Sequence, residues 1–269
     1  DQYQGRVLAL DHKTISKPVL KNLQVLAEAL PSGDGKLCLD VLAVSRGGLV
    51  ARGLVEGLAA LVQTTDGVPL SDRVQVRRVV LVATPNNGTP MGTNASALAC
   101  LDRVRCERED GKGGLGFSPD LSLLGSWGQE VFEHLFPGAA EMKKGSALLQ
   151  TLNGYSGGGT TLSTFGGLAG PVYHAVAARF KATELGYRGC VEGVFNDTEN
   201  DLVVPTAPCV NPTVRPGGVA ASLFTLPVGR RHTFDEQAGV THVDYFYRAR
   251  THRLIKAWLV DGVELTLPT

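Results

Sequence analysis

One strand–turn–helix pattern, residues 39–52 (LDVLAVSRGGLVAR), constrains the fold of this chain more than any other segment. The apolar run before the serine predicts a buried strand, and the apolar spacing after the glycine pair predicts an amphipathic helix. A residue at so sharp a turn has a strained backbone, so its neighbours two positions away have to be small, and they are Ala43 and Gly47. We therefore expect the hydroxyl of Ser45 to stand clear of the sheet edge, with the N–H of Arg46 pointing to where an oxyanion would form.

Strand and helix patterns alternate on both sides of this turn. Apolar runs predict strands at residues 6–10, 38–44, 79–83, 172–178 and around 190–195. Helical spacing predicts a helix capped by Ser16, a second helix over residues 46–62, and a closing helix that includes Tyr245 and Trp258. Such alternation predicts an α/β fold with a mostly parallel sheet and helices on both of its faces.

The regular alternation is interrupted between residues 91 and 170. Short helical patterns are separated there by glycine-rich stretches such as GKGGLG and GYSGGG. A chain of 269 residues fits one α/β domain with an insertion. We expect residues 1–90 and 171–269 to form the core, and residues 91–170 to form an inserted helical cap over the carboxyl edge of the sheet. The apolar side chains of the cap either form its own small core or line an apolar substrate pocket.

Composition excludes several classes of protein. The 26 basic and 26 acidic residues balance, and no basic stripe suggests a nucleic-acid partner. No apolar run approaches a membrane span, and the first residues lack a signal-peptide pattern. Five cysteines, an odd count without C-x-x-C spacing, favour reduced thiols and a cytoplasmic protein, although Cys100 and Cys106 could pair in an exported one. The Gly, Ala, Val and Arg content is compatible with a high-GC bacterial source.

A serine hydroxyl becomes a strong nucleophile when a histidine accepts its proton and a carboxylate orients that histidine. In one known arrangement the chain order is serine, acid, histidine. Asp201 lies in the polar loop NDTENDLVVP, and His242 lies in the last loop before the closing helix. Asp197 and Glu199 are alternative acids in the same loop as Asp201.

The other histidines carry weaker predictions. His232 is a reserve base, and His12, which follows a strand end, either shapes the oxyanion loop or is a structural histidine. His134, His174 and His252 lie in helical or strand-like patterns and are interpreted as structural or surface residues. No cluster has metal-ligand spacing, so we expect neither a catalytic metal nor a cofactor.

The motifs SRGGLVAR, TPNNGT, NDLVVP and the late TH before an aromatic helix resemble those of the lipase-like α/β-hydrolases. That group includes bacterial triacylglycerol lipases and the lipase-like relatives of GPI inositol-deacylases. The opening RVLALDHKTIS is similar to the same group, so the resemblance covers nearly the whole chain apart from the cap. It implies an α/β-hydrolase fold with Ser45 as nucleophile, Asp201 as acid, His242 as base and the Arg46 N–H as an oxyanion donor.

Two departures from this family pattern affect the expected fold and activity. Relatives usually have Gly and His where this chain has Ala43 and Val44. The family's oxyanion strand, which would lie inside the sheet between the strands at residues 6–10 and 38–44, is not found in the sequence. Buried unpaired backbone groups cost on the order of 1–3 kcal/mol each. We therefore expect an upstream segment or a second chain to supply that strand and the second oxyanion N–H. Direct pairing of the two flanking strands would contradict this expectation.

The sequence thus predicts a serine hydrolase that cleaves a carboxylic ester, with lipid esters included and amides or thioesters not excluded. The alternative is a catalytically degraded hydrolase domain that serves as an interaction or regulatory module of a larger protein. A third possibility is a hydrolase that its cap holds inactive until a partner or a cut in a glycine-rich segment releases it.

Overall fold

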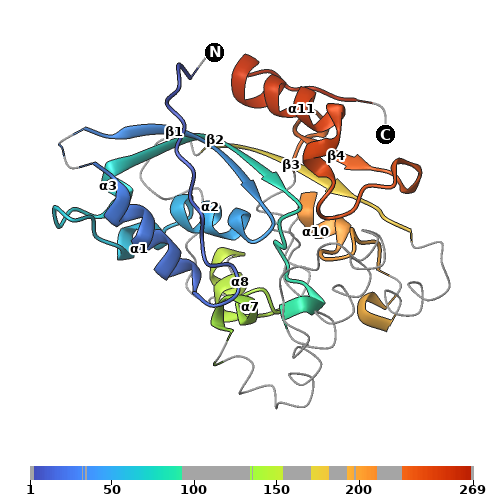
Figure 1. The fold of residues 1–269 in the computed structure, drawn as a ribbon, viewed down its shortest axis with the longest axis horizontal. Coiled ribbons are helices and arrows are strands. Elements are labelled where there is room, and N and C mark those ends of the chain that lie inside the picture. The colour runs from blue at the N-terminus through green and yellow to red at the C-terminus, as the bar shows by residue number, and fades with distance from the viewer. Residues whose placement is uncertain are drawn as a thin grey trace, which may run out of the picture.

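The computed structural model describes residues 3–31, 33, 35–92, 134, 136–153, 171–181, 193–196, 198–210 and 226–267. Their centre is a four-stranded sheet whose strand order follows the chain order (Figure 1). The strands are β1 (Leu37–Val44), β2 (Val74–Val82), β3 (Val172–Ala178) and β4 (Arg231–Phe234). All neighbouring strands are parallel, so their carboxyl ends lie at one edge of the sheet. The expected α/β class and parallel sheet are therefore confirmed.

The two inner strands, β2 and β3, are apolar because helices cover both of their faces. Val79 and Leu81 of β2 point into one hydrophobic cluster, whereas Val80 and Val82 point into another. Such a continuous apolar run is typical of a buried parallel strand. The helices α2 (Gly47–Val55) and α10 (Thr206–Val210) lie against the first face.

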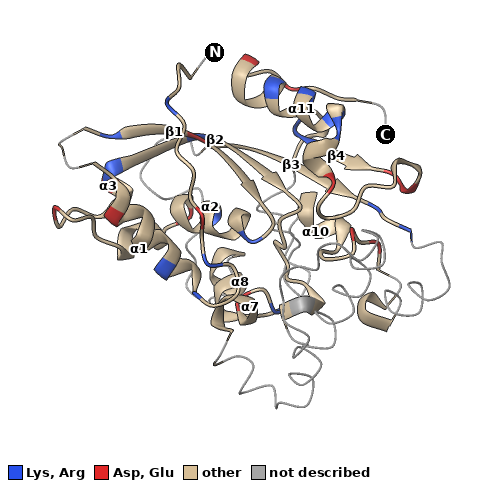
Figure 2. Cartoon of the chain, viewed as in Figure 1, with Lys and Arg blue, Asp and Glu red and all other residues tan. Residues whose placement is uncertain are grey.

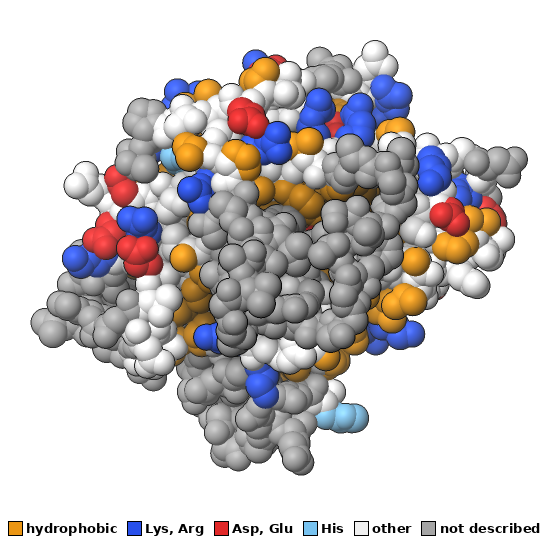
Figure 3. Space-filling model, turned by 180° about the vertical axis from the view of Figure 1, so that it is seen from behind, with side chains coloured by type: hydrophobic (Ala, Val, Ile, Leu, Met, Phe, Trp, Pro, Cys, Tyr) orange, Lys and Arg blue, Asp and Glu red, His pale blue; other side chains and the backbone are white. Residues whose placement is uncertain are grey.

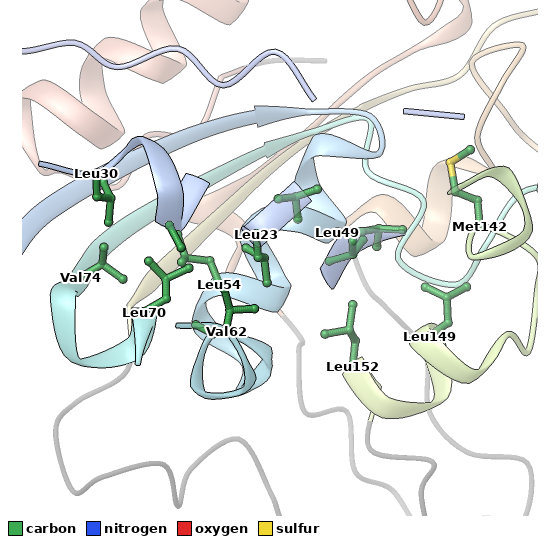
Figure 4. Packing of buried hydrophobic residues seen from close by; sticks show 14 of the residues in the cluster. Leu23, Leu30, Leu49, Leu54, Val62, Leu70, Val74, Met142, Leu149 and Leu152 are labelled. Carbon is green, nitrogen blue, oxygen red and sulfur yellow. The ribbon is translucent and has the colours of Figure 1, made fainter. Parts of the chain in front are cut away.

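A third hydrophobic cluster joins helices that lie on the α2 side of the sheet (Figure 4). They are α1 (Val19–Ala29), α3 (Leu70–Arg73), α7 (Pro137–Ala140) and α8 (Ala147–Leu152), with the 3-10 turn η1 (Leu58–Leu61) between α2 and α3. In Figure 4, leucines of α1, α2 and α8 point toward one another. Leu23 and Leu49 are fully buried, and burying one such side chain stabilises the fold by about 1.5–3 kcal/mol.

The opposite face of the sheet is covered by the end of the chain (Figure 1). The helix α11 (Ala249–Ile255) continues as the π-helical segment η7 (Lys256–Asp261), and Trp258 is fully buried against β2–β4. Short 3-10 turns complete the described elements: η2 (Pro90–Gly92), η4 (Val228–Arg230), η5 (Glu236–Ala238) and η6 (Tyr245–Tyr247).

Several predicted elements differ from the observed ones. Residues 6–10 form no strand, because no neighbouring strand pairs with them, and Val7 and Leu8 are largely exposed. The helix predicted over residues 46–62 breaks at Gly57, whose φ of 107° is left-handed. Residues 193–195 are helical rather than extended. The strand after β3 is instead β4, which the sequence analysis missed because RHTF is short and polar.

The start of α1 also differs from the prediction. Its N-cap is Pro18, and the Val19 N–H donates to the carboxylate of Glu141, 2.7 Å away, so Ser16 is not the cap. The described part of the predicted cap, residues 136–153, carries α7 and α8, whose side chains join the hydrophobic cluster of α1 and α2. The rest of the predicted cap, apart from the first residues of the segment and His134, lies outside the described residues.

The outer edge of β1 has no partner strand in the described part of the chain. β1 pairs with β2 alone, and Leu42 and Val44 are 44% and 41% exposed. The segment of residues 6–10 does not pair with β1 either, so the two strands that were expected to flank a missing strand do not pair directly. All-parallel sheets are normally covered on both faces, so exposed apolar side chains on one face of β1 are unusual.

Charged side chains are interspersed over the described residues. Figure 2 shows basic and acidic residues on most elements, and Figure 3 shows apolar side chains among charged ones on the face seen from behind. Within the described ranges, none of the helices combines the length and the apolar character needed to cross a bilayer.

Candidate functional site

Ser45 lies at a strained turn between β1 and α2. Its φ is +53°, a left-handed conformation that side-chain-bearing residues rarely adopt. The turn is fixed from both sides, because the Ser45 N–H donates to Val82 O of β2 at 2.8 Å and the Gly48 N–H donates back to Ser45 O at 3.0 Å. A Cβ at Gly48 would lie 1.9 Å from Thr84 Oγ1, so only glycine fits there. The local sequence thus presents the serine at the carboxyl edge of the sheet.

Asp201 lies in a tight loop beside that edge, and its carboxylate is almost fully buried. Oδ1 accepts hydrogen bonds from the N–H groups of Val203 and Val204, at 3.0 and 2.8 Å. Leu202 has a φ of +81°, which lets the loop fold back on the carboxylate. Burying a carboxylate is costly unless hydrogen bonds satisfy it, and this loop supplies two of them.

His242 connects the aspartate to the serine. Its Nδ1 lies 2.9 Å from Asp201 Oδ2, and its Nε2 lies 2.9 Å from Ser45 Oγ. The His242 N–H also donates to Asp201 O at 2.9 Å, which joins the two loops through the backbone. The structure therefore brings together the three residues that the sequence analysis selected, although 197 positions separate the serine from the histidine.

Tyr245, in η6, is a fourth member of this hydrogen-bonded group that the sequence analysis missed. Its hydroxyl donates to Asp201 Oδ2 at 2.9 Å, and its side chain is 1% exposed. Burial first, and then the charge of Asp201, raise the pKa of Tyr245 well above its usual value of 10, so the phenol keeps its proton. No sequence pattern marks this role, because an aromatic residue beside an amphipathic helix is interpreted as core.

The start of α2 and the side chain of His12 lie together beside the serine turn. No hydrogen bond from the N–H of Arg46 or Gly47 is found within the described residues, as expected at a helix start. His12 Nε2 lies 3.1 Å from where a Gly47 Cβ would stand, and His12 Nδ1 lies 3.2 Å from Thr14 Oγ1. Burial, followed by the nearby Arg46 charge, lowers the pKa of His12, so the neutral imidazole is favoured.

The side chain of Arg46 has a second role that was not predicted. It is fully buried and donates to Glu141 Oε2 at 2.6 Å, with further bonds to Lys17 O at 2.7 Å and Lys13 O at 3.4 Å. It thereby holds the loop that carries His12 against the serine turn. This role could not be found from sequence, because the ion pair joins residues 95 positions apart.

The segment TPNNGT after β2 is part of the protein interior rather than a surface turn. Asn86 is fully buried, and its amide donates to Pro208 O and Cys209 O while its Oδ1 accepts from Arg52. Arg52 in turn forms an ion pair with Glu56. The segment therefore ties α2 to α10 beneath the loop of Asp201, which is a supporting role.

The other candidates do not join the site in the described residues. Glu199 forms an ion pair with Arg179 on the surface, and Asp197 lies outside the described residues. His232, the reserve base, is buried on β4 against Phe234 and forms no bond to the serine. His174 stacks on Trp258, His252 bonds to Phe246 O, and His134 is exposed. Among the described residues no group of His, Cys, Asp or Glu side chains is arranged to hold a metal ion.

The fold and the site define an α/β protein whose parallel sheet presents a hydrogen-bonded serine, histidine and aspartate at its carboxyl edge. A family model described as a domain of unknown function (DUF7379) matches residues 1–260, and the chain belongs to that family. The match includes all four described strands and the three site residues. A comparison with curated proteins finds none that matches the chain.

Proposed function

We propose that this protein is a serine hydrolase of the α/β-hydrolase fold that cleaves a carboxylic ester through an acyl-enzyme. The observation that carries the proposal is the chain of two 2.9 Å contacts from Ser45 Oγ through His242 to Asp201 Oδ2. Ser45 lies at a strained turn at the carboxyl end of a parallel strand, where a nucleophile is accessible to substrate. The resemblance to lipase-like hydrolases supports the same reaction.

In the proposed reaction His242 Nε2 takes the hydroxyl proton as Ser45 Oγ attacks the ester carbonyl carbon. Asp201 holds the imidazole in the required tautomer and stabilises its positive charge. The tetrahedral intermediate collapses when the ester C–O bond breaks, and His242 returns the proton to the leaving alcohol. A water molecule, deprotonated by His242, then attacks the acyl-enzyme and releases the acid and free Ser45.

The negative oxygen of the intermediate is assigned to the Arg46 N–H and the neighbouring His12. Preorganised donors at such a position are worth about 2.7–4 kcal/mol each in related chemistry. Thr14 Oγ–H can donate to His12 Nδ1, which leaves a proton on Nε2 beside Gly47. The lowered pKa of His12 favours this neutral form.

Labelling with a fluorophosphonate probe tests the proposal, because such probes react with activated serines. We expect the wild-type protein to be labelled, and Ser45→Ala and His242→Ala to abolish labelling. Ser71→Ala is the matched control, since Ser71 lies in α3 at the opposite end of β2. A protein that is folded but not labelled would contradict the proposal. It would favour a catalytically degraded hydrolase domain, which the departure from the family pattern at Ala43 and Val44 also supports.

Ester, amide and thioester substrates share this chemistry, so activity assays have to identify the substrate class. Hydrolysis of p-nitrophenyl esters of increasing acyl length tests for an apolar acyl site: rising kcat/KM with chain length supports a lipid ester. The cytoplasmic location and bacterial source stay predictions.

We further propose that a strand from an upstream segment or a second chain pairs with the outer edge of β1. The outer edge of β1, which has no partner among the described residues, supports this. Hydrogen exchange on the native protein tests it, with β3, which is paired on both sides, as the internal control. Protection of every β1 amide supports an added strand, whereas fast exchange of alternate β1 amides contradicts it.

A further inference from the structure

One oxygen of Asp201 accepts two hydrogen bonds. Oδ2 lies 2.9 Å from His242 Nδ1 and 2.9 Å from the Tyr245 hydroxyl. The other oxygen is already occupied by the N–H groups of Val203 and Val204. The aspartate side chain is only 1% exposed, so water contributes little and these four donors determine how the charge is distributed over the two oxygens.

Tyr245 is held firmly in the position from which it donates. Its ring is buried and lies edge-on to Phe234, with ring centroids 6.2 Å apart. The loop that leads into η6 is closed by Asp244, whose carboxylate accepts from the N–H and the hydroxyl of Thr241. Only two residues separate the tyrosine from His242, so the turn fixes both groups that contact Oδ2.

We propose that Tyr245 is a positioning residue that, by sharing Asp201 Oδ2, sets how readily His242 takes the proton of Ser45. This inference rests on the proposed serine hydrolase activity. A hydroxyl on Oδ2 draws part of the carboxylate charge away from the imidazolium and fixes the plane of the carboxylate. Without the hydroxyl, Asp201 stabilises the protonated His242 more strongly, and a larger share of the enzyme holds the histidine in the form that cannot act as a base.

Other titratable groups face this pair from the elements packed against it. The Cys209 thiol of α10 is buried, and its pKa is raised well above the usual value by burial and by Asp201. Asp244 is bonded to Thr241, and on the serine side lie the neutral His12 and the Arg46 cation paired with Glu141. His12, Glu141 and Cys209 are unchanged in a variant of Tyr245, so the difference in pH dependence between that variant and the wild type reports on His242.

The test is the rate of fluorophosphonate labelling of Ser45 as a function of pH in the wild type and in Tyr245→Phe. We expect the acidic limb to move up by roughly 0.5–1 pH unit, because the carboxylate charge that the hydroxyl drew toward itself becomes available to the imidazolium. On that limb the rate then falls by about 3- to 10-fold. Tyr247→Phe is the matched control from the same turn: its side chain is 84% exposed, and we expect no shift.

A limb that does not move, even if the rate or the stability falls, overturns the inference and leaves Tyr245 a packing residue. Failure of the wild type to react contradicts the proposed hydrolase instead. An NMR titration of the His242 ring then still decides the inference without any reaction: the pH at which the imidazole takes up its proton has to rise in Tyr245→Phe. An unchanged value contradicts the role of Tyr245.

Discussion

The strained Ser45 depends on a glycine three residues further along the chain. Gly48 packs so closely on Thr84 that a Cβ would lie 1.9 Å from Oγ1 and 2.5 Å from Cγ2 of that fully buried threonine. Thr84 lies two residues after the end of β2 and has no room to move away. The segments that follow β1 and β2 thus pack directly on each other, because Gly48 has no side chain.

Gly48→Ala is therefore expected to destabilise the protein strongly. Overpacking of a tight interior costs about 1–3 kcal/mol, occasionally more, and urea denaturation measures the loss. Gly47→Ala is the matched control, because its Cβ would meet a half-buried imidazole at 3.1 Å, which can shift. Equal losses in the two variants would contradict the role assigned to Thr84.

At the scale of elements, Glu141 connects three parts of the chain. It follows α7, caps the start of α1 through the Val19 N–H, and neutralises Arg46 at the serine turn. Burial raises the pKa of Glu141 above its ordinary value, although the hydrogen bonds from Val19 and Arg46 lower it and thus favour the charged carboxylate. The segment of residues 136–153 is thereby attached directly to the site.

Glu141→Gln leaves the buried Arg46 cation without its counter-charge. We expect a loss of about 1–3 kcal/mol in the free energy of unfolding, below the 3–5 kcal/mol of a fully buried pair because Glu141 is 21% exposed. The double variant Arg46→Met with Glu141→Gln should recover part of that loss. Strictly additive effects in this double-mutant cycle would contradict the coupling.

Apolar runs predicted the strands correctly where the run also has a neighbouring strand to pair with. β1 and β3 came from such runs, whereas residues 6–10, equally apolar, form no strand because a strand also needs a neighbour. Ser45, Asp201 and His242 were found from residue type and chain order. Tyr245 and Glu141 were missed because their roles arise from contacts across the fold, which no local pattern contains.

At the scale of the whole molecule, two buried histidines should make stability fall in acid. His174 and His232 lie on neighbouring strands, and their pKa values are lowered to about 4, chiefly by burial and then by Arg230 and Arg250. The unfolded chain takes up these protons near its ordinary pKa of about 6.5, before the folded protein does. Stability is therefore fully present above that pH and decreases as the pH falls toward 4.

Each histidine should contribute a slope of up to about 1.4 kcal/mol per pH unit in this window. Urea denaturation at a series of pH values measures it, and His174→Phe or His232→Phe should make the dependence shallower. His252→Gln, at an exposed position, is the control and should leave the slope unchanged. A slope that survives in both Phe variants would assign the acid sensitivity to other groups.

The strand order of the sheet has a consequence for synthesis of the protein. Because β1 to β4 are added in chain order, a chain emerging from the ribosome can place each new strand beside the one before it. The serine turn is thus made before the rest of the site, because Asp201 and His242 follow Ser45 by 156 and 197 residues. On the proposed function, a nascent chain carries an inert Ser45 until the loops of Asp201 and His242 have been made, so hydrolytic activity begins only after all four strands have been added.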